Sequence, residues 1–164
     1  MTDASLRGDC SRCLGLCCVA LAFDRGTLFA FDKRAGEACR HLDAADRCAV
    51  HGRLGAEGLS GCAQYDCRGA GQLTTALFAG LSWRDNPAVA RQMFAAFARL
   101  REVQLLRCVL DEIGDSGLKQ RLAPSGGWTL PSLLALDIAA LRREARLALG
   151  GRPVVKGALG PARN

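Results

Sequence analysis

Apolar residues recur at steps of three and four along the second half of the chain. This spacing places an apolar stripe on one face of an amphipathic helix, which we expect over residues 87–113. Helices of globular proteins usually run over about 8–20 residues, so we expect a break near Gln104. The stripe consists of Val89, Met93, Phe97, Leu100, Val103, Leu106, Leu110 and Ile113.

Turn-forming residues mark both ends of this helix. Pro87 suits a first helical position, and the preceding Asp85 or Asn86 can cap it. Gly114 suits the left-handed conformation that often ends a helix. The boundaries of the long helix are therefore predicted by local chemistry as well as by periodicity.

Two further helices are expected. A short one covers residues 72–79, and a longer one runs over residues 131–149 and ends at Gly150-Gly151. The loop over residues 115–130 would let the two long helices pack as an antiparallel pair. The buried side of the second long helix would carry Leu134, Ile138, Leu141, Ala145 and Leu149, and Trp83, Phe94, Phe97 and Trp128 would serve as core or helix-contact residues.

The pattern changes before Gly69. Turn-forming residues and short apolar runs predict irregular loops and one-turn helices there, and a segment of this size is short of core by itself. We expect a mainly α protein in which a cysteine-cluster domain with irregular, metal-bound loops packs on a helical hairpin or bundle. The expected domains are residues 1–71 for the cysteine cluster and 72–151 for the helices, with a flexible tail over 152–164.

Eight of the nine cysteines crowd into the first domain. No basic run followed by an apolar stretch opens the chain, so we expect no signal peptide. No apolar run approaches the roughly 18 residues of a membrane span. We expect a cytoplasmic protein without membrane contact, in which clustered cysteines hold metal rather than form disulfides. The candidate ligands are Cys10, Cys13, Cys17, Cys18, Cys39, Cys48, Cys62 and Cys67.

The spacing of these cysteines constrains how they can share a metal. Cys10 and Cys13, as C-x2-C, can form a knuckle whose two sulfurs reach one ion, in zinc and iron–sulfur sites alike. Adjacent side chains diverge, so Cys17 and Cys18 either serve two different centres or only one of them is a ligand. Eight thiolates make two complete four-cysteine sets, and the order along the chain could give a cross-braced pair of sites.

Two alternatives remain for the metal, an iron–sulfur cluster and zinc. Zinc sites usually carry paired knuckles, whereas this chain has a single C-x2-C. Apolar residues beside the first cysteines would shield an iron–sulfur cluster from water, which places iron–sulfur slightly ahead of zinc. His41 and His51 stand near Cys39 and Cys48, and each can replace a thiolate or orient a ligand from outside.

Charge and composition narrow the choice of partners. The formal net charge is +6, with 22 Lys and Arg against 16 Asp and Glu. Eight thiolates on two divalent ions would add about −4, so most of this basicity would be cancelled. Basic residues are scattered and lack interleaved aromatic residues, which does not favour nucleic-acid binding. The abundance of arginine, alanine and glycine is typical of a bacterial protein from a GC-rich genome.

The ordered cysteines resemble a known family. Cys10-Ser-Arg-Cys13, Cys17-Cys18, Cys39-Arg-His41, Cys48-Ala-Val-His51, Gly61-Cys62 and Tyr65-Asp66-Cys67 are similar to the CxxCxxCC (YkgJ-like) proteins, a family of zinc- or iron-chelating domains. Most of the chain also resembles the N-terminal region of bacterial pentapeptide-repeat proteins that carry this cluster, although no repeats are present. The resemblance implies metal chelation and does not imply an activity.

Three functions follow from these observations. The first is a non-enzymatic metal-binding module with one or two thiolate-ligated centres, which responds to metal or redox state or binds a protein partner. The second is an electron-transfer or catalytic iron–sulfur protein. The third is a metal-dependent enzyme with an open coordination position, for which His41, His51 or Asp66 could act as a base. No metalloprotease, phosphate-binding or nucleophile-elbow motif supports catalysis.

The ninth cysteine yields a prediction. Cys108 lies within the expected long helix, where we interpret it as a buried, small apolar residue. We expect the variant Cys108→Ala to keep the full metal content of the wild-type protein, as measured by elemental analysis. Loss of a full metal equivalent would overturn the division of the cysteines into eight ligands and one bystander.

Overall fold

The computed structural model describes residues 6–150, apart from the side chains of Ile113 and Ser116. Within that range the protein is mainly helical, as predicted. Extended pairing among these residues is limited to two isolated antiparallel bridges, Phe23 with Lys33 and Leu42 with Cys48. The tail predicted over residues 152–164 lies outside the described residues.

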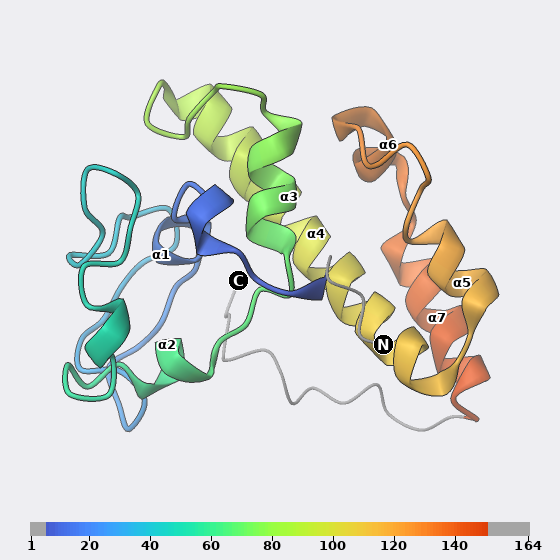
Figure 1. Cartoon of the computed structure of the whole chain (residues 1–164), viewed down its shortest axis with the longest axis horizontal. Coiled ribbons are helices and arrows are strands. Elements are labelled where there is room, and N and C mark those ends of the chain that lie inside the picture. Colours follow the sequence, from blue (N-terminus) through green and yellow to red (C-terminus); the bar gives the residue numbers. More distant parts are fainter. Residues whose placement is uncertain (1–5, 151–164) are drawn as a thin grey trace.

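Helices follow one another with irregular connections in the first half and short ones in the second (Figure 1). None of the described helices is both long and apolar enough to cross a membrane. The elements are η2 (Cys10–Arg12), α1 (Leu16–Ala20), η3 (His51–Arg53), α2 (Ser60–Gln64), α3 (Ala70–Leu77), α4 (Pro87–Ile113), α5 (Ser116–Arg121), α6 (Leu130–Ala135) and α7 (Ile138–Ala148), where η marks a 3₁₀ helix.

The long helix α4 has the predicted boundaries. The Asn86 side chain accepts hydrogen bonds from the backbone N–H groups of Ala88 and Val89, and Gly114 ends the helix with φ 74°. The break expected near Gln104 is wrong, because α4 is continuous there. Helices pack along α4 over most of its length, and tertiary packing rather than helix propensity supplies most of a helix's stability.

The second long helix of the prediction is two helices, α6 and α7. The chain leaves helical geometry at Leu136, and Asp137 caps α7 by accepting from the backbone N–H of Ala140. Arg99 of α4 donates to the carbonyls of Leu133 and Leu136 at the end of α6. Its guanidinium therefore satisfies carbonyl groups that a continuous helix would have bonded internally.

This interruption changes which residues of the segment are buried. Leu134 was expected in the core but is 51% exposed, whereas the neighbouring Leu133 is fully buried. Because of the break, the buried leucine of this segment is Leu133 and not Leu134. Ile138, Leu141 and Ala145 of α7 are buried as predicted.

Two other boundaries differ from the prediction. Helix α3 begins at Ala70, two residues earlier than expected. The segment expected to be loop over residues 115–130 contains α5, which Asp115 caps by accepting from the backbone N–H of Leu118. A single capping aspartate is a weak signal in sequence, because it also favours a simple turn.

Helix α4 is the axis of the arrangement. Helices α1 and α3 pack against it on the side of the cysteine-rich loops, and α5, α6 and α7 pack against it toward the other end of the molecule (Figure 1). Helix α3 also contacts η2, which carries the first cysteine knuckle. The cysteine-rich segment is therefore supported by the helical half of the chain.

Two hydrophobic cores lie on either side of α1. The first core joins α1 and α3 to α4 and α7, and the second core lies under the cysteine-rich loops. Residues of the first core include Leu16, Val19, Ala70, Met93, Phe97, Leu100, Val103, Leu106, Leu133 and Leu141, and the second core consists of Phe23, Phe29, Val50, Leu54 and Leu59.

Hydrogen bonds fasten the cysteine-rich segment to the helices. The Trp83 indole N–H donates to the Leu14 carbonyl at 2.8 Å, and the Thr75 hydroxyl accepts from the Leu14 N–H at 3.3 Å. The Gln72 side chain bonds the backbone of Arg7 and Asp9. The first core also crosses the boundary predicted near residue 71, and the division into two folding units stays a prediction.

The buried stripe of α4 gives a stability prediction. Leu100 is fully buried in the first core, so Leu100→Ala should lower the free energy of unfolding by about 2–5 kcal/mol. Leu147 is 79% exposed, and Leu147→Ala should change it by less than about 0.5 kcal/mol. Urea unfolding followed by circular dichroism measures both, and similar losses for the two variants would contradict the described packing of α4.

Candidate metal centre

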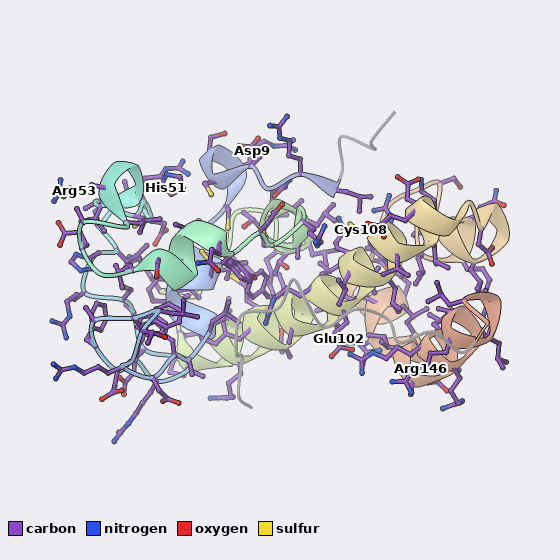
Figure 2. The ribbon with its side chains drawn as sticks, turned by 90° about the horizontal axis from the view of Figure 1, so that it is seen from below. Asp9, His51, Arg53, Glu102, Cys108 and Arg146 are labelled. Carbon is purple, nitrogen blue, oxygen red and sulfur yellow. The ribbon has the colours of Figure 1, made fainter. Side chains whose placement is uncertain are left out.

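The eight N-terminal cysteines line one cavity of about 400 Å³. Its wall is formed by η2, α1, α2, the loops that connect and follow them, and Arg101 of α4. The ninth cysteine is not part of it. Cys108 lies on α4, well apart from the wall residue His51 (Figure 2). The structure therefore brings together the cysteines that the sequence singled out: Cys10, Cys13, Cys17, Cys18, Cys39, Cys48, Cys62 and Cys67.

The C-x2-C segment forms a tight turn at the cavity. The Asp9 carboxylate accepts from the Ser11 N–H at 3.0 Å, and the Cys13 N–H donates to the Cys10 carbonyl at 3.4 Å. From outside, the Arg47 guanidinium donates to the Ser11 carbonyl at 2.8 Å and also to that of Cys10. These bonds hold the backbone of the knuckle while both of its sulfurs face the cavity.

Helix α1 presents two sulfurs to the cavity. Cys17 and Cys18 both line the wall, and their Sγ atoms are 3.9 Å apart. The expectation that these adjacent side chains diverge is therefore wrong, because both sulfurs reach the same cavity. Successive side chains on a helix are separated by about 100° rather than by the half-turn of a strand, so a cavity that wraps the helix can receive both.

The loop after α1 brings two more cysteines to the same helix. The Cys39 N–H donates to the Cys18 carbonyl at 2.8 Å, which fixes the loop against α1. Cys48 pairs with Leu42 in one of the isolated bridges. The loop therefore folds back so that Cys39 and Cys48 reach the cavity wall from the side of α1 that carries Cys18.

The last two cysteines, Cys62 and Cys67, lie shortly before α3 in the chain. Cys62 lies in α2, and the Cys67 carbonyl accepts from the N–H of Ala70, the first residue of α3. A Cβ placed on Gly71 would lie 2.7 Å from the Cys13 sulfur and 3.7 Å from the Cys67 sulfur. Glycine at this position therefore lets the two sulfurs approach α3 closely.

The environment of the thiols changes their acidity. Burial raises the pKa of Cys13 to about 11 and that of Cys62 to about 11. In contrast, the hydrogen bond from Cys18 lowers the pKa of Cys17 to about 7, and the same bond raises the pKa of Cys18. At neutral pH the metal-free protein therefore keeps Cys13 and Cys62 protonated, and a metal that binds them must displace protons.

A buried cation lies beside the thiols. The Lys33 side chain is 6% exposed, and its ammonium group donates to the carbonyls of Val19, Leu21 and Arg34. Burial lowers the pKa of Lys33, whereas the neighbouring thiols, Cys39 first among them, favour its charged form. Sequence analysis did not identify Lys33, because no local motif marks it and only the chain reversal after α1 buries it.

Two further polar groups in the wall are without hydrogen-bond partners. The Tyr65 hydroxyl and the Arg101 Nε are both buried without one. The Arg101 guanidinium lies 5.5 Å from the ring centre of Tyr65 and 5.8 Å from that of Phe97. Tyr65 stands two residues before Cys67, so its closeness to a cysteine in sequence could have marked it as a wall residue. Arg101 lies in α4, far from any of the eight cysteines in sequence, and no such pattern marked it.

The two histidines have different positions. His51, in η3, lines the cavity and is exposed, and Asp66 also lines it. His41 is not part of the wall, and its ring lies 5.8 Å from that of Phe31. The structure therefore places one of the two candidate histidines beside the thiols.

The donor set fits thiolate-binding metals. Eight sulfurs surround a cavity bordered by apolar side chains such as Phe23 and Leu59, which is the chemistry of zinc and iron–sulfur sites. Within the described residues, no three or more His, Cys, Asp or Glu side chains are arranged to hold a metal ion.

Cys108 has a polar contact that the sequence did not predict. Its sulfur accepts a hydrogen bond from the Arg68 guanidinium at 3.3 Å, and its side chain is partly exposed. The expectation of a buried apolar role for Cys108 is therefore wrong. The reason is that Arg68, which follows Cys67, reaches across to α4 at this position.

The chain is similar to a curated bacterial protein. The uncharacterized protein YybG of Bacillus subtilis (strain 168) is 40% identical over 108 residues, which cover 65% of this chain and 39% of that protein. The chain thus spans less than half the length of this relative. No family model matches the chain, and no solved structure matches it.

The close approach of α3 to the sulfurs can be tested. Gly71→Ala would place a methyl group 2.7 Å from the Cys13 sulfur, and such overpacking costs about 1–3 kcal/mol. Helix propensity would return at most about 1 kcal/mol, so we expect a net loss of stability and displacement of the Cys13 sulfur. Urea unfolding and the metal content of the purified variant are the measurements.

Gly52→Ala is the matched control for this change. A Cβ on Gly52 meets no atom within 4 Å, so this variant should keep both its stability and its metal content. Equal behaviour of the two variants would show that α3 does not press on the sulfurs.

Proposed function

We propose that this chain is a metal-binding protein whose cysteine-rich half holds thiolate-ligated centres. The observation that carries the proposal is the gathering of eight thiols from distant segments around a single cavity of about 400 Å³. These eight cysteines form no disulfides in the structure, so disulfide bonding does not account for their gathering, whereas a shared ligand would.

Iron–sulfur is favoured over zinc. The four sulfurs around a zinc ion each lie about 2.3 Å from the metal, so they crowd around one point. The cavity of about 400 Å³, in contrast, has room for more than one metal atom. Apolar residues on its wall would keep water from an iron–sulfur centre, which would supply one-electron redox chemistry when bound.

Positive charge near the cavity supports an anionic centre. Thiolates bound to metal keep a net negative charge, which a low-dielectric environment makes costly unless it is balanced. Lys33 is buried next to the cysteines that follow α1, and Arg101 lies in the wall beside Tyr65. These two cations would offset part of the charge of the centre.

The role we propose is that of a module that responds to metal or redox state. A module of this kind needs a centre tied to a folded platform, and here η2 contacts α3, which packs on α4. Loss of the centre would release the loops from that platform. The protein partner and the bacterial, cytoplasmic setting expected from the sequence stay predictions.

Electron transfer or redox catalysis is the second candidate. It is favoured by the polar groups of the wall that are not thiols: the Tyr65 hydroxyl and Arg101 Nε are buried without partners, and His51 is exposed at the cavity. Such groups could hold a small molecule beside a centre. A reduction of the centre that is followed by electron transfer to an added acceptor would distinguish this role from sensing.

Metal analysis of protein purified without oxygen tests the proposal. We expect iron with acid-labile sulfide, a brown colour, and visible absorbance that bleaches on reduction. Removal of the metal by a chelator should lower stability, because the loops lose their shared anchor. A colourless protein with stoichiometric zinc would show that the metal is zinc and not iron. A metal-free protein that stays fully folded would overturn the proposal.

A further inference from the structure

We propose that the eight thiols form two separate four-thiolate centres. Cys10, Cys13, Cys17 and Cys67, which we call the helix-side set, would hold one, and Cys18, Cys39, Cys48 and Cys62, which we call the loop-side set, would hold the other. This inference rests on the proposed function, and it assigns a centre to every cysteine of the cavity. Three features of the structure lead to the same division.

The first feature is the division of the cysteines between the two hydrophobic cores. Cys13, Cys17 and Cys67 pack against the first core. Cys48 and Cys62 pack against the second core. The cysteines that share a core therefore share a wall of the cavity, and no cysteine packs against both cores.

The second feature is a small hollow beside the main cavity. Its volume is about 20 Å³, and the only cysteines that line it are the four of the helix-side set. Gly71 and Phe97 complete its wall from α3 and α4. Hence Cys10, which packs against neither core, is placed with Cys13, Cys17 and Cys67 by an observation independent of core packing.

The third feature is how the loop-side cysteines are tied together. The Cys39 N–H donates to the Cys18 carbonyl at 2.8 Å. Cys39 in turn is joined to Cys48 through Leu42, whose N–H donates to the Cys39 carbonyl and which forms a bridge with Cys48. The backbone therefore holds three of the four loop-side cysteines in one continuous arrangement.

The adjacent pair in α1 joins the two sets. Cys17 packs against the first core, whereas Cys18 is bonded through its carbonyl to Cys39. Their sulfurs are 3.9 Å apart, so the two centres would be neighbours linked by one peptide unit. The sets are also nested, since every loop-side cysteine lies between Cys17 and Cys67 in the chain. The arrangement differs from the cross-braced pair considered from sequence.

Metal content of paired variants tests the division. We expect Cys39→Ser to keep half of the wild-type metal, and the within-set double variant Cys39→Ser/Cys48→Ser to keep the same half. The cross-set double variant Cys39→Ser/Cys67→Ser should keep none. Cys108→Ala is the control and should keep all of it. A within-set pair that loses everything, or a cross-set pair that keeps half, would overturn the division.

A measurement on the wild-type protein tests the same division without relying on variants, which could fail to fold. During stepwise removal of metal by a chelator, cysteines released from a centre react with iodoacetamide and are located by mass spectrometry. We expect two groups of four, each alkylated together and matching the two sets. Alkylation of all eight in one step, or of groups that mix the sets, would contradict the division. A wild-type protein that binds no metal would instead overturn the proposed function itself.

Discussion

Burial of the apolar face of α4 against α1 and α3 is the contact on which the rest of the structure depends. Leu16 and Val19 of α1 share the first core with Phe97 and Leu100 of α4, so the helix that carries the adjacent cysteines is anchored in the largest apolar cluster of the described chain. The cysteine-rich loops have only a small core of their own. They gain a defined arrangement because α1 and α3 hold their ends on α4.

Charge is the second constraint, and it acts on the cavity. Burial in a mostly apolar wall raises the pKa of Cys13 and Cys62, and the neighbouring thiols add to this effect. Lys33 and Arg101 place positive charge close by, and a bound metal would supply more. In our proposal, a bound metal takes the place of the protons that these thiols carry in the metal-free protein.

Much of the helical half could be predicted because its signals are local. The stripe of α4, the Asn86 cap and the Gly114 end all depend on residues within a few positions of one another. The errors occur where a distant group intervenes. Arg99 of α4 accommodates the break between α6 and α7 by binding the carbonyls that end α6, and that break exposes Leu134. No pattern within residues 130–149 contains this information.

Patterns along the chain are enough to predict the eight-cysteine cluster, the two ends of the long helix and most of the apolar residues that this helix buries. The arrangement of that cluster depends on the tertiary fold. Cys17 and Cys18 both reach the cavity, and His51 lines it while His41 does not. Arg101 also lines the cavity, and Lys33 is buried beside the thiols. The physical reason is that helix periodicity and capping come from neighbours along the chain. The wall of a cavity is assembled instead from segments far apart in sequence, and their contacts exist only once the cores have packed.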